Sequence, residues 1–214
     1  MIRPSIIGMT EGVAPQDVRR SAFVNAAREA FFTHGYAGTT MSSIAVAVGG
    51  SKTTLWSYFP SKQDLFVAVV DDLVETYGTA LEVPIDLHAP VEDALRRFAT
   101  GMMAIVQSPP IIDLHRLVTG EAGRFPELGA LFYERGPARG RAKLSAYIDG
   151  AMRDGRMRTG DPGKAAGQFV MLCQSGAYQH RMFGLSSGDN SDTIAADVDA
   201  AIDMFMRAWV HSSP

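Results

Sequence analysis

Apolar residues in the first part of the chain recur at helical spacing. Between Pro15 and His34 they follow one another three or four positions apart, which predicts an amphipathic helix. Gly35 comes directly after this stretch and is a suitable left-handed residue to end the helix. The apolar face of such a helix must be buried, so other helices are expected to pack against it.

A short second helix is predicted by its flanking residues. Thr39 and Thr40 are both suitable N-caps for a helix through Val48. Ile44 lies on its apolar side, and Gly49-Gly50 ends it after about two turns.

Two further helices follow the glycine pair. Ser51 can cap a third helix through Phe59, which Pro60 prevents from continuing. Ser61 can cap a fourth helix, over about 61–81, with Asp64 in the position of a capping-box acid. Two short helices joined by a tight turn and braced by a longer helix are typical of a helix-turn-helix unit.

The third helix separates its side chains into two faces. Leu55 and Phe59, four positions apart, point inward. The opposite, outward face carries Lys52, Thr53, Trp56 and Ser57. Thr54 and Tyr58 lie at the edges of this face. Hydroxyls, a lysine and threonine methyls suit base edges and phosphates in a major groove. The alternative is a helical subdomain with a merely solvated polar face, which the exposed Trp56 disfavours.

The stretch from Phe31 to Phe66 resembles the DNA-binding domain of TetR/AcrR-type regulators. The matching motifs are F-x-x-x-G-Y at Phe31 to Tyr36, and S-K-x-T-L-aromatic-x-Y-F followed by Lys62. The resemblance implies that a set of polar and aromatic residues contacts DNA: Thr39, Thr40, Ser42, Ser51, Lys52, Thr53, Thr54, Trp56, Ser57, Tyr58 and Lys62. Within this set it implies base-groove contacts from the third helix, and a phosphate held by Lys62.

Two residues depart from the family pattern. Gly50 stands where a small apolar residue is usual, which is expected to loosen the turn. Trp56 replaces the commoner Tyr, so the donor to a phosphate becomes an indole N–H.

The remaining two thirds of the chain continue the helical periodicity. No stretch alternates with a period of two, which predicts an all-α fold. Helices are expected over Val91–Gln107, Ile111–Glu121, Glu127–Arg153, Lys164–Phe183 and Asp192–His211. We expect a DNA-binding domain at 15–62, linked by the fourth helix to a larger helical domain at 82–214.

Residues 116–137 resemble the C-terminal domain of AefR-like members of the same family. This resemblance implies a ligand-binding and dimerisation domain whose last two long helices pair across a two-fold axis.

Charge is distributed unevenly along the chain. The net charge is −3, yet residues 1–62 carry six basic and three acidic residues. A basic end on an acidic body fits a protein that binds a polyanion. No apolar run is long enough to span a membrane, the N-terminus lacks the features of a signal peptide, and Cys173 is the single cysteine. These features predict a cytoplasmic protein without disulfides.

The C-terminal part is rich in methionine, which suits an adaptable apolar pocket. We expect a ligand cavity lined partly by Met103, Leu114, Leu117, Phe132, Met171 and Cys173. The alternative is a solid core made of the same residues. Cys173 lies on an apolar stretch and is expected to be a buried small hydrophobe.

Three polar residues in the C-terminal part suggest a polar binding site. His115, with Arg116 and Glu121 nearby, could recognise a carboxylate or bind a metal, although such residues on a helix are more often structural.

The sequence therefore predicts a repressor that binds double-stranded operator DNA at an inverted repeat as a homodimer. An unidentified small apolar or aromatic effector would release it, and no cofactor, metal or membrane is expected. One alternative is an effector-independent regulator controlled by a protein partner. A third is a small enzyme using Glu121, His115 and Cys173, for which the chain offers no known catalytic motif.

Overall fold

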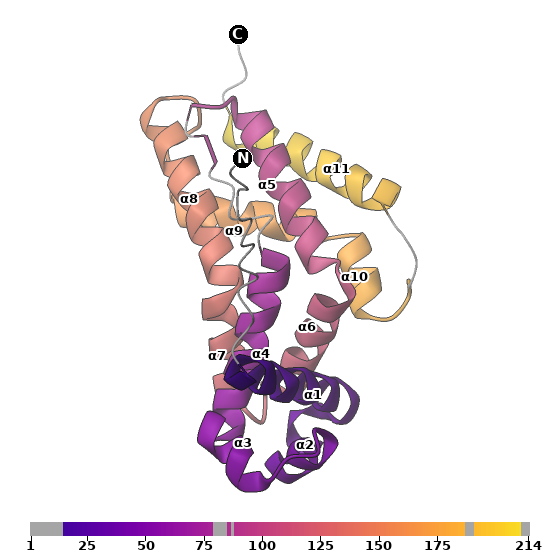
Figure 1. Ribbon diagram of the computed structural model, residues 1–214. Coiled ribbons are helices and arrows are strands. Elements are labelled where there is room, and N and C mark those ends of the chain that lie inside the picture. The colour runs from indigo at the N-terminus through magenta and orange to yellow at the C-terminus, as the bar shows by residue number, and fades with distance from the viewer. Residues whose placement is uncertain (1–14, 79–84, 87, 187–190, 211–214) are drawn as a thin grey trace, which may run out of the picture.

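The computed structural model describes residues 15–78, 85–86, 88–186 and 191–210, and within these ranges it contains eleven helices and no strand. The helices are α1 (Pro15–Gly38), α2 (Met41–Ala47), α3 (Lys52–Tyr58), α4 (Lys62–Tyr77), α5 (Val91–Val106), α6 (Pro109–Glu121), α7 (Pro126–Arg135), α8 (Pro137–Arg153), α9 (Pro162–Cys173), α10 (Ala177–Met182) and α11 (Ser191–Trp209). Figure 1 shows α1, α2 and α3 at one end of an elongated molecule and α5, α9 and α11 toward the other. The predicted all-α fold is confirmed.

Local capping residues determine where the three short N-terminal helices begin. Thr40 caps α2 and shares a reciprocal capping box with Ser43. Ser51 caps α3 by accepting a hydrogen bond from the backbone N–H of Thr54, and Ser61 caps α4 in the same way. Each cap supplies a partner for a backbone N–H that the helix itself leaves unpaired. These predicted helix starts are confirmed.

The two glycines of the turn between α2 and α3 act in different ways. Gly49 has a φ of +64°, a conformation that costs other residues energy. A Cβ atom at Gly50 would lie 2.9 Å from the Arg19 guanidinium and 3.3 Å from the Phe23 ring. Gly50 therefore lets α1 approach the turn closely, and the expectation that it loosens the turn stays a prediction.

The buried apolar residues form two separate cores. One contains Phe31, Leu55 and Phe66 from α1, α3 and α4, together with residues of α6 and α7 such as Leu128. The other lies among α5, α8, α9 and α11 and is centred on Tyr147 and neighbouring aromatic side chains. Since α6 and α7 pack on the N-terminal core, the packing does not divide at the predicted boundary between 15–62 and 82–214.

Two expected long helices are in fact broken. The prediction of a single helix over Glu127–Arg153 is wrong, because this stretch forms two helices, α7 and α8, that meet at Gly136-Pro137. Proline lacks the backbone N–H that a continuous helix would use, and it disfavours helical geometry in the residue before it.

The single helix expected over Lys164–Phe183 is also wrong. It divides into α9 and α10 because Asp197 of α11 accepts a hydrogen bond of 2.6 Å from the backbone N–H of Ala177. A Cβ atom at Gly176 would overlap that carboxylate. The expected helix ends at Leu81 and His211 lie outside the described residues.

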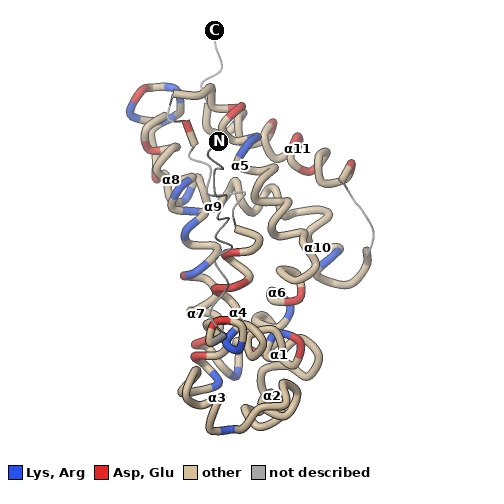
Figure 2. The backbone as a smooth tube through the Cα atoms, in the orientation of Figure 1, with Lys and Arg blue, Asp and Glu red and all other residues tan. Residues whose placement is uncertain are grey.

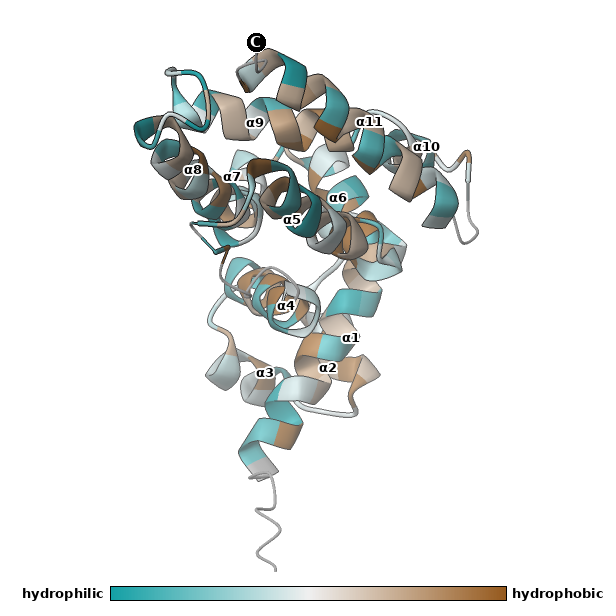
Figure 3. Cartoon of the chain, turned by 90° about the horizontal axis from the view of Figure 1, so that it is seen from above, coloured by the Kyte–Doolittle hydropathy of each residue, from teal (hydrophilic) through white to brown (hydrophobic). Residues whose placement is uncertain are grey.

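In the C-terminal half, α9 packs against α8 on one side and against α11 on the other (Figure 3).

Among the described residues, no helix is both long enough and apolar enough to cross a membrane.

Candidate nucleic-acid interface and internal cavity

Helix α3 lies at the end of the molecule away from α11 (Figure 2). Leu55 is fully buried, and the next inward residue, Phe59, is buried beside it. Lys52, Thr53 and Ser57 are exposed on the opposite side, and 49% of Trp56 is accessible. The predicted division of this helix into an inward and an outward face is confirmed.

Some polar side chains of α3 already form hydrogen bonds within the protein, and others do not. Ser51 Oγ lies 2.8 Å from Thr54 Oγ1, and Ser57 Oγ donates to the Thr54 carbonyl at 2.7 Å. Lys52 and Thr53 make no hydrogen bond with any other described residue. These two side chains, and the exposed indole of Trp56, can therefore meet an external ligand without giving up a bond to another described residue.

The predicted DNA-contacting hydroxyls at the start of α2 are partly engaged within the protein. Ser42 is partly exposed, and Thr40 is exposed but engaged with Ser43 in the capping box. Thr39 is only 1% exposed, and its hydroxyl lies 3.0 Å from the Ala30 carbonyl and 2.8 Å from the Gly35 carbonyl. This hydroxyl binds the end of α1, and the DNA contact expected for Thr39 stays a prediction.

Lys62 is also tied into the fold. Its Nζ donates to the carbonyls of Tyr36 at 2.7 Å and Thr39 at 3.0 Å, and it lies 4.2 Å from the centre of the Tyr36 ring. Burial lowers the pKa of Lys62, and the Glu121 carboxylate acts in the opposite direction. An ammonium has three N–H donors, so one is left for a phosphate. That phosphate contact stays a prediction, and the side chain also holds α1 against α4.

Two basic residues beside this surface were missed from the predicted contact set. The Arg19 guanidinium lies 5.6 Å from the centre of the Phe23 ring, and that of Arg20 lies 5.3 Å from the Phe59 ring. Both therefore lie next to the turn and to α3. The signal was present in the sequence as the basic pair that contributes to the positive charge of residues 1–62.

A cavity of about 270 Å³ lies among α4, α5, α6, α7, α8 and α9. Leu114, Phe132 and Met171 line it, as predicted. Met103, Leu117 and Cys173 do not line it, so these three assignments are corrected. Met103 and Cys173 are fully buried in the C-terminal core and Leu117 packs in the N-terminal core.

His115 also lines the cavity and has a polar partner there. Its Nδ1 lies 2.7 Å from the Tyr178 hydroxyl, and its ring meets Phe132 edge to face at 4.9 Å. Burial lowers the pKa of His115 to about 4. The imidazole is therefore uncharged at neutral pH.

The suggested group of His115, Arg116 and Glu121 does not form. Arg116 donates to the backbone carbonyls of Arg181 and Met182 at the end of α10. Glu121 instead accepts a hydrogen bond of 3.0 Å from the backbone N–H of Ala37. Over the described ranges, no three His, Cys, Asp or Glu side chains are grouped to hold a metal.

Cys173 behaves as a small hydrophobic residue, as predicted. It is fully buried, and burial raises the pKa of its thiol to about 12. A thiol of this kind does not supply the thiolate that nucleophilic catalysis requires.

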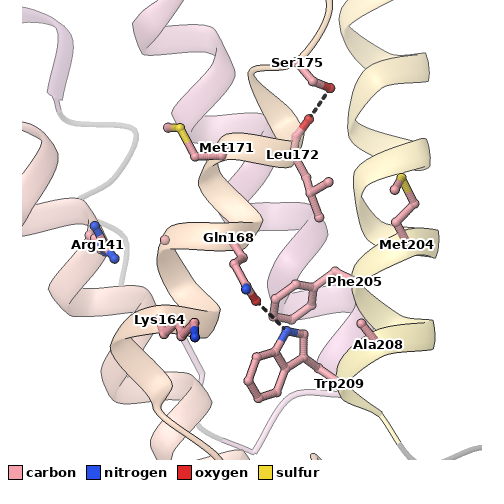
Figure 4. A pocket seen from close by; sticks show the side chains of 11 residues that line it. Arg141, Lys164, Gln168, Met171, Leu172, Ser175, Met204, Phe205, Ala208 and Trp209 are labelled. Atoms are coloured by element: carbon pink, nitrogen blue, oxygen red, sulfur yellow. Dashed lines mark hydrogen bonds between the residues drawn. The ribbon is translucent and has the colours of Figure 1, made fainter.

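A second hollow lies on the surface between α9 and α11 (Figure 4). It measures about 640 Å³, and its apolar lining includes Met171, Leu172, Met204 and Phe205. Met171 is 61% exposed and Met204 is 57% exposed. Exposed apolar side chains that gather in one place commonly mark an interaction surface.

Two families of sequences match this chain. Residues 23–69 match the family described as bacterial regulatory proteins, tetR family. Residues 93–210 match the family described as AefR-like transcriptional repressor, C-terminal domain.

Individual relatives agree with these matches. The transcriptional regulator RutR of Escherichia coli is 33% identical over 91 residues, which cover 39% of this chain and 43% of RutR. The transcriptional activator FasR of Mycolicibacterium smegmatis is 36% identical over 88 residues, covering 39% of this chain and 40% of FasR. The chain thus matches less than half the length of these curated relatives. Among solved structures, the flavonoid-responsive regulator FrrA has a TM-score of 0.79 and 31% identity, covering 92% of this chain and 100% of FrrA.

Proposed function

The chain belongs to the TetR family of DNA-binding transcriptional regulators, and we propose that it is a repressor released from operator DNA by a small apolar or aromatic effector. Regulators of this family bind operator DNA, typically as dimers, and are not enzymes. Because the proposed target is bacterial DNA, we infer that the protein acts in the cytoplasm.

The exposed face of α3 carries the DNA-binding part of the proposal. Lys52 and Thr53 offer unpaired donors, and the buried Leu55 fixes the orientation of the helix that presents them. A rigid helix with a lysine, hydroxyls and an aromatic residue on one face suits the major groove. One recognition helix covers only a few base pairs, so we propose a homodimer on an inverted repeat.

Selection from random double-stranded oligonucleotides tests this part directly. The full-length protein should enrich an inverted repeat whose half-sites lie about one helical turn or more apart. Enrichment of a single asymmetric site, or of no sequence, would contradict a dimeric repressor of this kind.

The internal cavity supports the effector part of the proposal. It is mostly apolar, and Leu114, Phe132 and Met171 surround it. FrrA is named for its response to flavonoids, which are aromatic, and it matches this chain over nearly its whole length. A cavity of this kind favours the ligand-gated regulator over the effector-independent alternative.

Helix α6 offers a physical connection between the cavity and the DNA-binding end. Its middle lines the cavity through Leu114 and His115, and its last residue, Glu121, binds the backbone of Ala37 just after α1 turns at Gly35. A ligand can move an equilibrium only through a difference in affinity for two states. We propose that a filled cavity shifts α6 and favours a spacing of the two recognition helices that fits the operator poorly.

A second candidate function is activation of transcription rather than its repression. The relative FasR is named an activator, and the same DNA-binding surface serves either direction of control. A reporter gene behind the selected operator distinguishes them, because deletion of a repressor raises expression and deletion of an activator lowers it.

Thr53→Ala should relax base preference at one position of each half-site. Thr53 is exposed and has no internal hydrogen bond in the described chain, so its loss removes a base contact and leaves the helix intact. A base contact is worth roughly 1–3 kcal/mol of discrimination. The measurement is fluorescence anisotropy with the selected operator and single-base variants of it. Thr33→Ala, at an exposed position of α1, is the control. Equal loss of affinity on all sequences would contradict the assignment.

A further inference from the structure

The charged residues that line the internal cavity are all of one sign. Arg135, Arg139, Arg141 and Lys143 reach it from the end of α7 and the first half of α8. No Asp or Glu is found among the lining residues that the structure describes. The lining is otherwise largely apolar, so these cations dominate its electrostatics.

Only part of this positive charge is neutralised within the protein. The guanidinium of Arg135 pairs with Asp71 of α4 at 2.8 Å. Among the residues that the structure describes, Arg141 donates only to the Gly163 carbonyl, at 3.0 Å from its nearer nitrogen. Arg139 is exposed and has no polar partner in the described part of the chain. Two guanidinium groups beside the cavity thus have no carboxylate partner within the described ranges.

The placement of these cations is unfavourable for α8 itself. Three of them fall within the first seven residues of the helix, and its first acidic residue is Asp149. Cations are disfavoured near a helix N-terminus, and like charges four positions apart, as at Arg139 and Lys143, repel one another. Figure 2 shows these basic positions following one another along α8. An anion bound beside Arg139 and Arg141 would offset the cost of placing cations at this helix N-terminus.

The α6 side of the cavity has a different character. Leu114 and Phe132 are apolar, and His115 is uncharged because burial holds its pKa near 4. A dry cavity of roughly 150 Å³ accommodates benzene. The volume of about 270 Å³ therefore suits one or two rings rather than a long chain.

We propose that the effector is an aromatic carboxylate, with its ring system between α6 and α7 and its carboxylate against the cations of α8. This assignment rests on the proposed function and adds the charge and orientation of the ligand. A cationic amphiphile of the same size would meet Arg139 and Arg141 with no carboxylate to offset them.

Three probes of nearly equal shape test the charge directly. They are 2-naphthoate, 2-naphthamide and the 2-naphthylmethylammonium ion, titrated calorimetrically into the full-length protein. Hydrogen bonds to charged groups are stronger than neutral ones, so we expect 2-naphthoate to bind roughly tenfold more tightly than 2-naphthamide. The ammonium probe should bind most weakly. The preference for 2-naphthoate should shrink at high ionic strength, because the cations border solvent.

A matched pair of variants locates the carboxylate. Arg139→Gln should reduce the preference for 2-naphthoate over 2-naphthamide several-fold, with little effect on binding of the amide. Arg153→Gln removes the same charge from α8 at a residue that does not line the cavity, and it should leave the preference unchanged. Circular dichroism of each variant confirms that the helices are retained.

The outcomes separate this inference from the proposed function. Equal binding of the three probes, failure of all of them to bind, or equal effects of the two variants would overturn the inference. If the inference fails but bound probes still weaken operator binding, the proposed function stands. If 2-naphthoate binds with the expected preference but operator affinity does not change, the ligand class stands and effector-controlled release fails.

Discussion

Glutamate at both Met171 and Met204 should convert the protein from a dimer to a monomer and lower its affinity for the operator by at least about 1000-fold. Both side chains are more than half exposed and line the groove between α9 and α11. We propose that the second subunit covers this apolar hollow in the dimer, because α9 and α11 fall in the two segments expected to pair across the two-fold axis. Four carboxylates would then be buried at the interface, where removing charge from water is costly.

The size of the effect follows from the geometry of the DNA. Specific binding typically exceeds non-specific binding by 10³-fold or more, and a monomer engages only one half-site. Sedimentation velocity measures the oligomeric state, and anisotropy measures operator affinity. Ala146→Glu is the control, since it adds the same charge at an exposed position of α8 outside the groove. A double variant that stays dimeric and keeps operator affinity would show that the dimer forms elsewhere.

Acidification should destabilise the protein through His115, by about 3 kcal/mol between pH 7 and pH 4. Burial lowers the pKa of His115 from 6.5 to about 4 in the folded chain. The unfolded chain binds this proton near pH 6.5, so it holds more protons than the folded chain in the interval between. The stabilisation is therefore fully present above pH 6.5 and is lost as pH falls toward 4.

Urea denaturation at a series of pH values tests this expectation. His115→Gln should flatten the decline in the free energy of unfolding over that interval relative to the wild type. His34→Gln, at an exposed position of α1, should leave the decline unchanged. Equal pH profiles for the wild type and His115→Gln would contradict the assignment.

The N-terminal unit could be predicted closely because its signals are local. Ser51, Ser61 and the Gly49-Gly50 pair act on backbone groups within a few residues, so their roles can be predicted from the sequence alone. Thr39 and Thr40 illustrate the limit. Both are suitable caps, and only the packing of α1 determines that Thr39 turns inward.

The C-terminal half was less predictable because its breaks and its cavity depend on distant residues. The division at Gly136-Pro137 had a local signal in the proline, whereas the one at Gly176 depends on Asp197 of α11. Apolar periodicity identifies buried positions but does not tell a cavity wall from a solid core. Hence Leu114 lines the cavity while Cys173, equally buried, packs in the C-terminal core.

The charge of the cavity also required the structure. Arg139, Arg141 and Lys143 are ordinary surface residues in the sequence, and only the packing of α7, α8 and α9 gathers them around one apolar space. The inference that the ligand carries a carboxylate follows from this placement of the three cations beside the cavity.

The central claim, that a ligand in the cavity controls operator binding, is tested most directly by measuring the operator dissociation constant with and without a bound compound. Thermal-shift screening of apolar and aromatic compounds supplies the compound, and Val106→Trp, which fills the cavity from α5, supplies the control. A coupling of about 1–3 kcal/mol predicts that the compound weakens operator binding roughly 5- to 150-fold in the wild type and has no effect on Val106→Trp. Compounds that stabilise the wild-type protein yet leave its operator affinity unchanged would contradict the account.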